Sequence, residues 1–169
     1  MQPLLGVAKF IKLINQTDCR STMKINTQAL IKEDAGWFVA QLRNVKAFSV
    51  LSDNDLVKLV SQMRSYDFKA GTTLVNQGES VNLFFIVHEG LVEVSVRKFF
   101  FWEKRVATLK AGEFFGESVL VSNSKRTATV KALTDTSCFV LLKPSFKSTL
   151  NHNTLFKENM KVVFARRKR

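Results

Sequence analysis

The hydrophobic pattern of the chain changes from helical spacing to alternation near Tyr66, and this change constrains the fold more than any other feature. From Tyr66 to Leu142, short apolar and β-branched runs alternate with polar residues, as in half-buried strands. Seven strand candidates follow one another: Tyr66–Lys69, Thr72–Asn76, Leu83–His88, Leu91–Arg97, Arg105–Leu109, Thr127–Leu133 and Ser137–Leu142. Seven short strands at this spacing predict a small sandwich or barrel.

Five glycines separate these runs, each where a turn needs a positive φ or a residue without Cβ: Gly71, Gly78, Gly90, Gly112 and Gly116. Both flanks have helical spacing. Within residues 1–60, Ser52 followed by Asp53 predicts an N-capped helix that leads into the strands. After Pro144 an apolar helical stripe returns. We therefore expect an α+β fold of helices, barrel and helices.

The length of 169 residues suits one domain with appendages. The net charge of +12 is concentrated at the ends, because residues 157–169 hold six Lys and Arg against one acidic residue and residues 1–46 hold seven against three. We interpret the basic run at 166–169 as a solvated helix end that complements the helix dipole. The alternative is that this charge binds anionic lipid or nucleic acid, and nucleic acid is the less favoured of the two.

The cysteines, the histidines and the apolar runs do not indicate a metal site, a redox site or a membrane span. Cys19 and Cys138 follow no metal or redox spacing, and no signal-peptide pattern is present, so we expect free thiols in the cytoplasm. Without an apolar run of membrane-spanning length, any membrane association is expected to be peripheral or through a partner. His88 and His152 lack a second ligand at metal spacing and are expected in a strand and a loop, so no metal site is predicted.

A candidate receptor for a phosphorylated sugar lies within residues 115–129. Gly116 allows close approach of the backbone, and free N–H groups of a helical turn over Ser118–Leu120 suit an anion. Arg126 can grip phosphate oxygens with its rigid donor fork. Glu117, when ionised, can accept a hydrogen bond from a ribose hydroxyl.

At these residues the sequence resembles the cyclic-nucleotide-binding domain family, whose motif reads Phe-Gly-Glu-x-Ala-Leu, followed five residues later by Arg-x-Ala. The two parts stand here as Phe115–Leu120 and Arg126–Ala128. The family's upstream glycine pattern is matched by Gly71, Gln77–Glu79, Leu83–Val87 and Gly90. The resemblance covers about residues 40–165.

The resemblance implies a jelly-roll, cupin-like β-barrel at about residues 66–143 and lid helices at about 145–165. Together these would form a domain of residues 47–165, with an N-terminal helical extension at 1–46 and a basic tail at 166–169. The implied ligand is cAMP or cGMP.

The resemblance also implies a role for each candidate site residue. Glu117 would bind the ribose 2′-hydroxyl and Arg126 the cyclic phosphate. The backbone would complete the phosphate cradle around Gly116, Ser118, Val119 and Ala128. The lid helix would cap the base with an apolar or aromatic side chain, for which the candidates are Phe156, Met160 and Phe164.

Three departures from the family pattern bear on affinity. Val119 replaces a small alanine, Lys125 replaces a common proline, and Asn82 replaces an acidic residue that helps to hold the arginine in kinase-regulatory members. Thr127 bears on specificity, since its hydroxyl could bind the amine of guanine. Channels that respond to cAMP also carry Arg-Thr-Ala, however, and family frequency favours cAMP.

The segment Phe99–Trp102, flanked by Arg97, Lys98, Lys104 and Arg105, is predicted at the turn of a hairpin. Its rings either extend the core or form an exposed surface for a protein partner or for shallow membrane contact.

The leading functional hypothesis is a non-catalytic cyclic-nucleotide sensor whose helices transmit ligand binding to an effector, such as a kinase catalytic subunit, a channel or an assembly partner. An enzyme is not expected, because the sequence has no paired nucleophile and base and no Walker loop. The alternative is a structural or docking subunit with a nucleotide-independent barrel. It would act through its helices, the aromatic hairpin and the basic tail.

Overall fold

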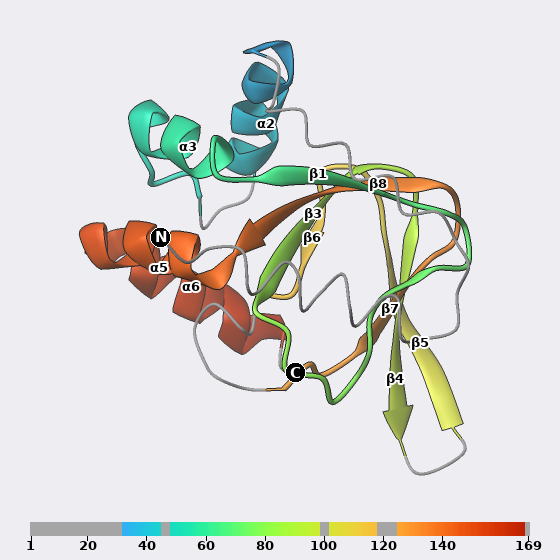
Figure 1. The fold of residues 1–169 in the computed structure, drawn as a ribbon. Coiled ribbons are helices and arrows are strands. Elements are labelled where there is room, and N and C mark those ends of the chain that lie inside the picture. Colours follow the sequence, from blue (N-terminus) through green and yellow to red (C-terminus); the bar gives the residue numbers. More distant parts are fainter. Residues whose placement is uncertain (1–31, 45–47, 99–101, 118–124, 168–169) are drawn as a thin grey trace.

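A computed structural model describes residues 32–44, 48–98, 102–117 and 125–167. Within these ranges two helices precede eight strands and two more helices follow them (Figure 1). The elements are α2 Lys32–Asn44, α3 Asp53–Val60, β1 Arg64–Phe68, β2 Thr73–Val75, β3 Leu83–Glu89, β4 Val92–Lys98, β5 Trp102–Leu109, β6 Phe114–Phe115, β7 Thr129–Ala132, β8 Thr136–Leu142, α5 Lys143–His152 and α6 Thr154–Arg167.

The strands form two antiparallel four-stranded sheets, in the orders β1-β8-β3-β6 and β2-β7-β4-β5. The sheets enclose one set of buried side chains, and the helices lie on one side of the roll (Figure 1). The predicted α+β architecture, a small sandwich or barrel flanked by helices, is confirmed, and it takes the form of a two-sheet β-roll.

Strand β3 is buried on both faces, which explains its uninterrupted apolar sequence. Side chains of a strand alternate between its two faces. Phe84 and Ile86 therefore point toward the helices, whereas Phe85 and Val87 point between the sheets. This strand separates two hydrophobic clusters, which we call the helix core and the roll core.

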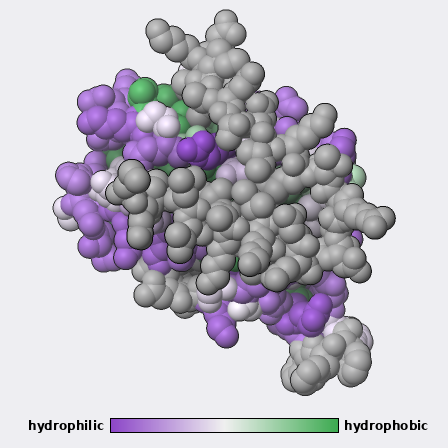
Figure 2. Space-filling view, in the orientation of Figure 1, coloured by the Kyte–Doolittle hydropathy of each residue, from purple (hydrophilic) through white to green (hydrophobic). Residues whose placement is uncertain are grey.

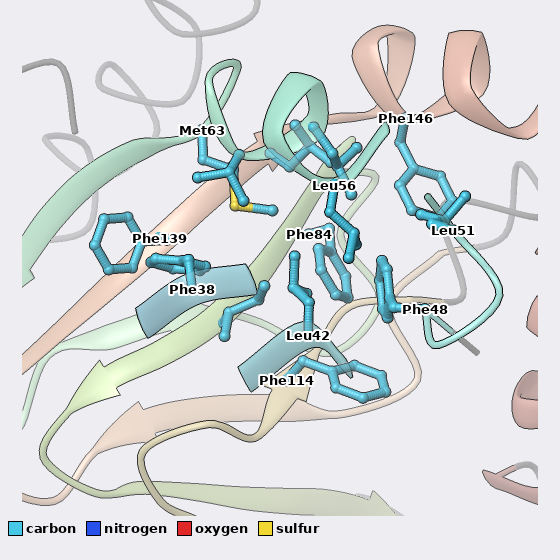
Figure 3. Packing of buried hydrophobic residues seen from close by; sticks show 14 of the residues in the cluster. Phe38, Leu42, Phe48, Leu51, Leu56, Met63, Phe84, Phe114, Phe139 and Phe146 are labelled. Carbon is cyan, nitrogen blue, oxygen red and sulfur yellow. The ribbon is translucent and has the colours of Figure 1, made fainter. Parts of the chain in front are cut away.

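The helix core holds the helices against the outer face of the β1-β8-β3-β6 sheet (Figure 3). Phe38 of α2 lies edge-on to Phe139 of β8, with ring centroids 3.9 Å apart. Phe48 lies between the sheet and the C-terminal helices, 6.1 Å from Phe84 and 5.2 Å from Phe156. Burying a phenylalanine contributes about 1.5–3 kcal/mol, so these rings fix the helices firmly to β3 and β8.

The roll core fills the space between the sheets. Its buried members are Tyr66, Phe68, Leu74, Val75, Leu83, Phe85, Val87, Val92, Phe115, Val130, Ala132, Cys138 and Val140.

Several local expectations are confirmed. Ser52 caps α3 by accepting a hydrogen bond from the Asp55 amide at 3.1 Å, and Pro144 lies in the first turn of α5. The five punctuating glycines all have positive φ, between 85° and 89°.

Three details differ from the expectation. Strand β6 was not predicted, because two residues are too few to show alternation. Strand β5 begins at Trp102 rather than Arg105, since pairing of Trp102 with Lys98 extends the hairpin. His152, expected in a loop, ends α5, where its Nδ1 lies 2.6 Å from the carbonyl oxygen of Ser148. An imidazole can satisfy a carbonyl left unpaired at a helix end.

The surface of the described residues is mostly hydrophilic on the face shown in Figure 2, with hydrophobic areas confined to small regions, the clearest near α2 and α3. No helix within the described ranges has the length and apolar character needed to cross a membrane.

Candidate functional site

Arg126 lies buried at the inner face of β3, with 4% of its surface exposed. Its Nη2 donates a hydrogen bond to the carbonyl oxygen of Leu83 at 2.5 Å. Its guanidinium carbon lies 6.0 Å from the centroid of the Phe85 ring, which stacks on Phe115 at 4.7 Å. The first residue of β3 and an aromatic pair therefore hold the guanidinium at the edge of the roll core.

Two other nitrogens of the Arg126 guanidinium group have no partner in the part of the chain that the structure describes. Nε and Nη1 of Arg126 are buried and have no hydrogen-bond partner among the residues that the structure describes. Burial lowers the pKa of Arg126 to about 10, and the negative charges of Glu117 and Glu79 offset this effect only in part. Buried donors without partners are costly and call for an explanation, and an anion beside the guanidinium group would supply it.

Gly116 leaves the space that the guanidinium fills. Its φ is +86°, and a Cβ built there would overlap Nη1 of Arg126 and lie 2.9 Å from the carbonyl oxygen of Leu83. The adjacent Glu117 is also buried, with 9% of its surface exposed. Gly116, Glu117 and Arg126, which the sequence motif links across nine residues, therefore do lie together.

The loop between β2 and β3 completes the surroundings of Arg126. The Gly78 amide donates to the Arg126 carbonyl at 2.9 Å, and the Arg126 amide donates to the Glu79 carbonyl at 2.8 Å. Sequence reasoning treated Gly78 and Glu79 only as part of a glycine pattern. The signal for their role was the Gln-Gly-Glu turn itself, but nothing in the sequence indicated which strand or loop it contacts.

The remaining cradle candidates are described only in part. Thr127 is exposed beside Arg126, and Ala128 is half-buried. Ser118 and Val119 lie outside the described residues, as does the helical turn expected over Ser118–Leu120.

The departures at Lys125 and Asn82 lie at exposed positions. The carbonyl of Leu83, next to Asn82, accepts the hydrogen bond from Arg126. The contact that this part of the chain makes with the Arg126 guanidinium group is therefore made by the backbone.

Two of the three base-cap candidates on α6, Phe156 and Met160, belong to the helix core. Phe156 and Met160 are fully buried, and the Phe156 ring lies 5.2 Å from Phe48 and 5.5 Å from Phe146. They therefore pack on the face of β3 opposite to Arg126. The side chain of Phe164 lies outside the description. The base-cap role stays a prediction.

The other singled-out residues have structural surroundings. His88 lies in β3, where its Nδ1 is 3.2 Å from the Ser137 hydroxyl and its ring contacts Trp37 at 4.7 Å. Cys138 is free and buried, and burial raises the pKa of its thiol well above the usual value. Cys19 lies outside the described residues. Within the described ranges, no three His, Cys, Asp or Glu side chains are grouped so as to hold a metal ion.

Of the aromatic segment Phe99–Trp102, the structure describes only the last residue. Trp102 opens β5 with 78% of its surface exposed, whereas Phe99, Phe100 and Phe101 fall outside the description. Trp102 therefore does not extend the core, and the placement of the other three rings stays open.

Comparison with known proteins gives a family match over the strand region. Residues 66–153 match the model of the family described as cyclic nucleotide-binding domain. Among curated relatives, a cGMP-dependent protein kinase of Plasmodium berghei is 33% identical over 135 residues, which are 79% of this chain and 15% of that kinase. The chain thus spans a small part of the kinases it matches.

Solved structures share the fold. The regulatory domain of Toxoplasma gondii protein kinase A with cAMP superimposes with a TM-score of 0.68 and 23% identity, covering 79% of this chain and 51% of that one. The regulatory subunit of a cAMP-independent protein kinase A from Trypanosoma brucei superimposes with a TM-score of 0.65 and 24% identity, covering 79% and 47%.

Proposed function

Because this chain belongs to the cyclic nucleotide-binding domain family, we propose that it is a non-catalytic sensor that binds a cyclic nucleotide beside Arg126 and transmits binding through its helices. The observation that carries the proposal is the buried Arg126 guanidinium, whose Nε and Nη1 have no partner among the described residues. A cyclic phosphate presents oxygens that accept hydrogen bonds from guanidinium donors.

The proposed division of roles follows the charges around Arg126. Arg126 binds the cyclic phosphate, and the buried Glu117 accepts a hydrogen bond from the ribose 2′-hydroxyl. Backbone groups near Gly116, Ser118, Val119 and Ala128 complete the cradle, and Thr127 borders it. A bound phosphate would restore the pKa of Arg126 toward its ordinary value, because a nearby negative charge favours the protonated form.

The ligand is proposed to be cAMP or cGMP. The Plasmodium relative, at 33% identity, is cGMP-dependent by name, and this favours cGMP over the cAMP expected from family frequency. The likeness to the Toxoplasma domain with cAMP, at 23% identity, supports the fold alone.

Transmission is proposed to pass through β3. The inner face of this strand carries Phe85 beneath Arg126, while its outer face carries Phe84 in contact with Phe48 and Phe146 of the helix core. A shift of Arg126 on nucleotide binding would therefore reach the packing of α5 and α6 through a single strand. Differential packing of these helices in the two states is what an effector would detect.

The effector is proposed to be a kinase catalytic subunit, since the curated relatives include cGMP-dependent protein kinases and a regulatory subunit of cAMP-dependent protein kinase. Channels and other assembly partners remain alternatives. The proposed location is the cytoplasm, with any membrane association through a partner or the exposed Trp102 region.

Isothermal titration calorimetry with cAMP and cGMP tests the proposal. We expect binding by the wild-type chain, loss of about 100-fold or more in affinity for Arg126→Ala, and a smaller loss for Glu117→Ala. Lys131→Ala removes an exposed cation on β7 and serves as the matched control, expected to bind almost normally. Absence of heat with both nucleotides at high micromolar concentration would refute the sensor, and normal binding by Arg126→Ala would refute the phosphate assignment.

The second candidate function is a docking subunit whose roll does not depend on nucleotide. The Trypanosoma neighbour, described as part of a cAMP-independent kinase, has this same fold, so the fold alone does not imply regulation by cAMP. Such a subunit would act through its helices, the hairpin and the basic tail. The same calorimetry distinguishes the two, because this candidate predicts no heat with either nucleotide.

A further inference from the structure

The backbone of Arg126 is fixed by a turn that lies far from it in sequence. The amide of Gly78 and the carbonyl of Glu79 form a reciprocal pair of hydrogen bonds with the carbonyl and amide of Arg126, at 2.9 and 2.8 Å. These bonds close a small ring between the β2–β3 loop and the segment before β7. Wherever this turn is placed, the Arg126 backbone must follow.

The turn has a well-defined internal shape. The Glu79 carboxylate accepts hydrogen bonds from the Asn76 amide at 3.1 Å and from the Asn76 Nδ2 at 2.9 Å. These contacts lie within the turn, so they fix its conformation but not its position relative to the sheet. The position must come from contacts outside the turn.

Gln77 supplies such contacts. Its Oε1 accepts a hydrogen bond from the Arg97 amide at 2.7 Å, and its Nε2 donates to the Arg97 carbonyl at 3.2 Å. Its own amide donates to the Thr129 hydroxyl at 3.0 Å. One residue therefore joins the turn to the end of β4 and to the start of β7.

The contact with Arg97 occurs at the end of β4, where β7 no longer pairs with this strand. Strand β4 pairs with β7 only as far as Ser95 and Thr129, whereas its pairing with β5 continues to Lys98. Beyond Ser95 the Gln77 side-chain amide pairs with both backbone groups of Arg97, as the peptide group of a neighbouring strand would. These two hydrogen bonds therefore fix the position of the turn relative to the β4–β5 hairpin.

We infer that Gln77 is a positioning residue for Arg126, because its side chain anchors the turn that holds the Arg126 backbone to the end of β4. Recognition of a phosphate by a guanidinium requires the donor fork to be held within about 0.5 Å of its working position. The Leu83 carbonyl holds the far end of the Arg126 side chain, and the anchored turn holds the near end. The inference concerns the same site as the proposed function and rests on it only for the binding measurement.

Hydrogen exchange without nucleotide, compared between the wild-type chain and Gln77→Ala, tests the inference directly. In Gln77→Ala we expect the Gly78 and Arg126 amides to lose about tenfold in protection, while amides of the β3–β8 pair, such as Ile86 and Val140, keep theirs. Gln62→Ala is the matched control, because Gln62 also donates a side-chain hydrogen bond to a backbone carbonyl, that of Lys58, but on α3. An equal loss over all amides, or no loss at Arg126, would overturn the inference.

Calorimetry provides the second measurement. Gln77→Ala is expected to weaken nucleotide binding by about fivefold, because it removes the two hydrogen bonds to Arg97 and only part of their free energy affects the position of Arg126. Gln62→Ala is expected to leave nucleotide binding unchanged. Unchanged affinity in Gln77→Ala, measured on a chain that binds nucleotide, would overturn the inference. If the wild-type chain binds neither nucleotide, the proposed function fails, and the exchange measurement still decides whether Gln77 positions Arg126.

Discussion

Gly116→Ala tests whether this glycine is required to make room for the Arg126 guanidinium. Two separate costs follow from the structure. The backbone at Gly116 has φ +86°, and an alanine there is strained by about 1–2 kcal/mol. In addition, the new Cβ would overlap Nη1 of Arg126, so the guanidinium must move away from the Leu83 carbonyl. Losing a charged hydrogen bond costs about 1.5–3 kcal/mol.

Gly71→Ala is a control in which only the backbone strain, and no steric overlap, is expected. Gly71 has φ +85°, and a Cβ built there meets no atom within 4 Å. Gly71→Ala should therefore lower the free energy of unfolding by the strain alone, about 1–2 kcal/mol. Gly116→Ala should lower it by about 2.5–5 kcal/mol, the sum of both effects.

Urea unfolding measures the free energies, and calorimetry with cGMP and cAMP measures the effect on the site. We expect Gly71→Ala to bind nucleotide like the wild type and Gly116→Ala to lose at least about 100-fold in affinity, because the displaced Arg126 no longer presents its donors. Equal unfolding free energies for the two variants would show that the guanidinium is not held where the structure has it. That result would refute the reasoning from the Gly116 contact.

Two further predictions concern residues outside the site. Because the hydrogen bond from Lys69 and that from the Ala70 amide lower the pKa of Asp135, its stabilising contribution is present above the ordinary carboxyl pKa and is lost as pH falls through the lower folded value. Asp135→Asn should therefore reduce the loss of stability between about pH 5 and about pH 2, measured by urea midpoints, and an unchanged slope would contradict the assignment. Cys138 is fully buried with a raised thiol pKa, so in a Cys19→Ser variant it should react with a thiol reagent only on unfolding. Rapid reaction in native buffer would show that the roll core opens locally.

The residue types and spacing of the chain already determine much of the site. Gly116, Glu117 and Arg126 were predicted to meet because a glycine, a carboxylate and an arginine at these spacings form a recognisable motif, and they do lie together in the structure. A small sandwich or barrel was predicted from alternation and from the glycines at turns, and the structure shows that it is a roll of two sheets. The N-cap at Ser52 was predicted because capping is a local interaction, decided within a few residues.

Long-range packing was beyond the sequence. Alternation shows that Phe84 and Phe85 face opposite sides of β3, but it does not show that one side meets helices and the other meets Arg126. For the same reason Phe156 and Met160 have a helical stripe in sequence, yet only the fold assigns that stripe to the helix core.

The sequence by itself determined the kind of chain this is: an alternating strand region that contains a motif of one glycine, one carboxylate and one arginine. Only the tertiary structure decided how the arginine is held. Its contacts with Leu83, Gly78 and Glu79 join segments more than forty residues apart. Such contacts leave no periodic signal, because each depends on where the chain returns after folding.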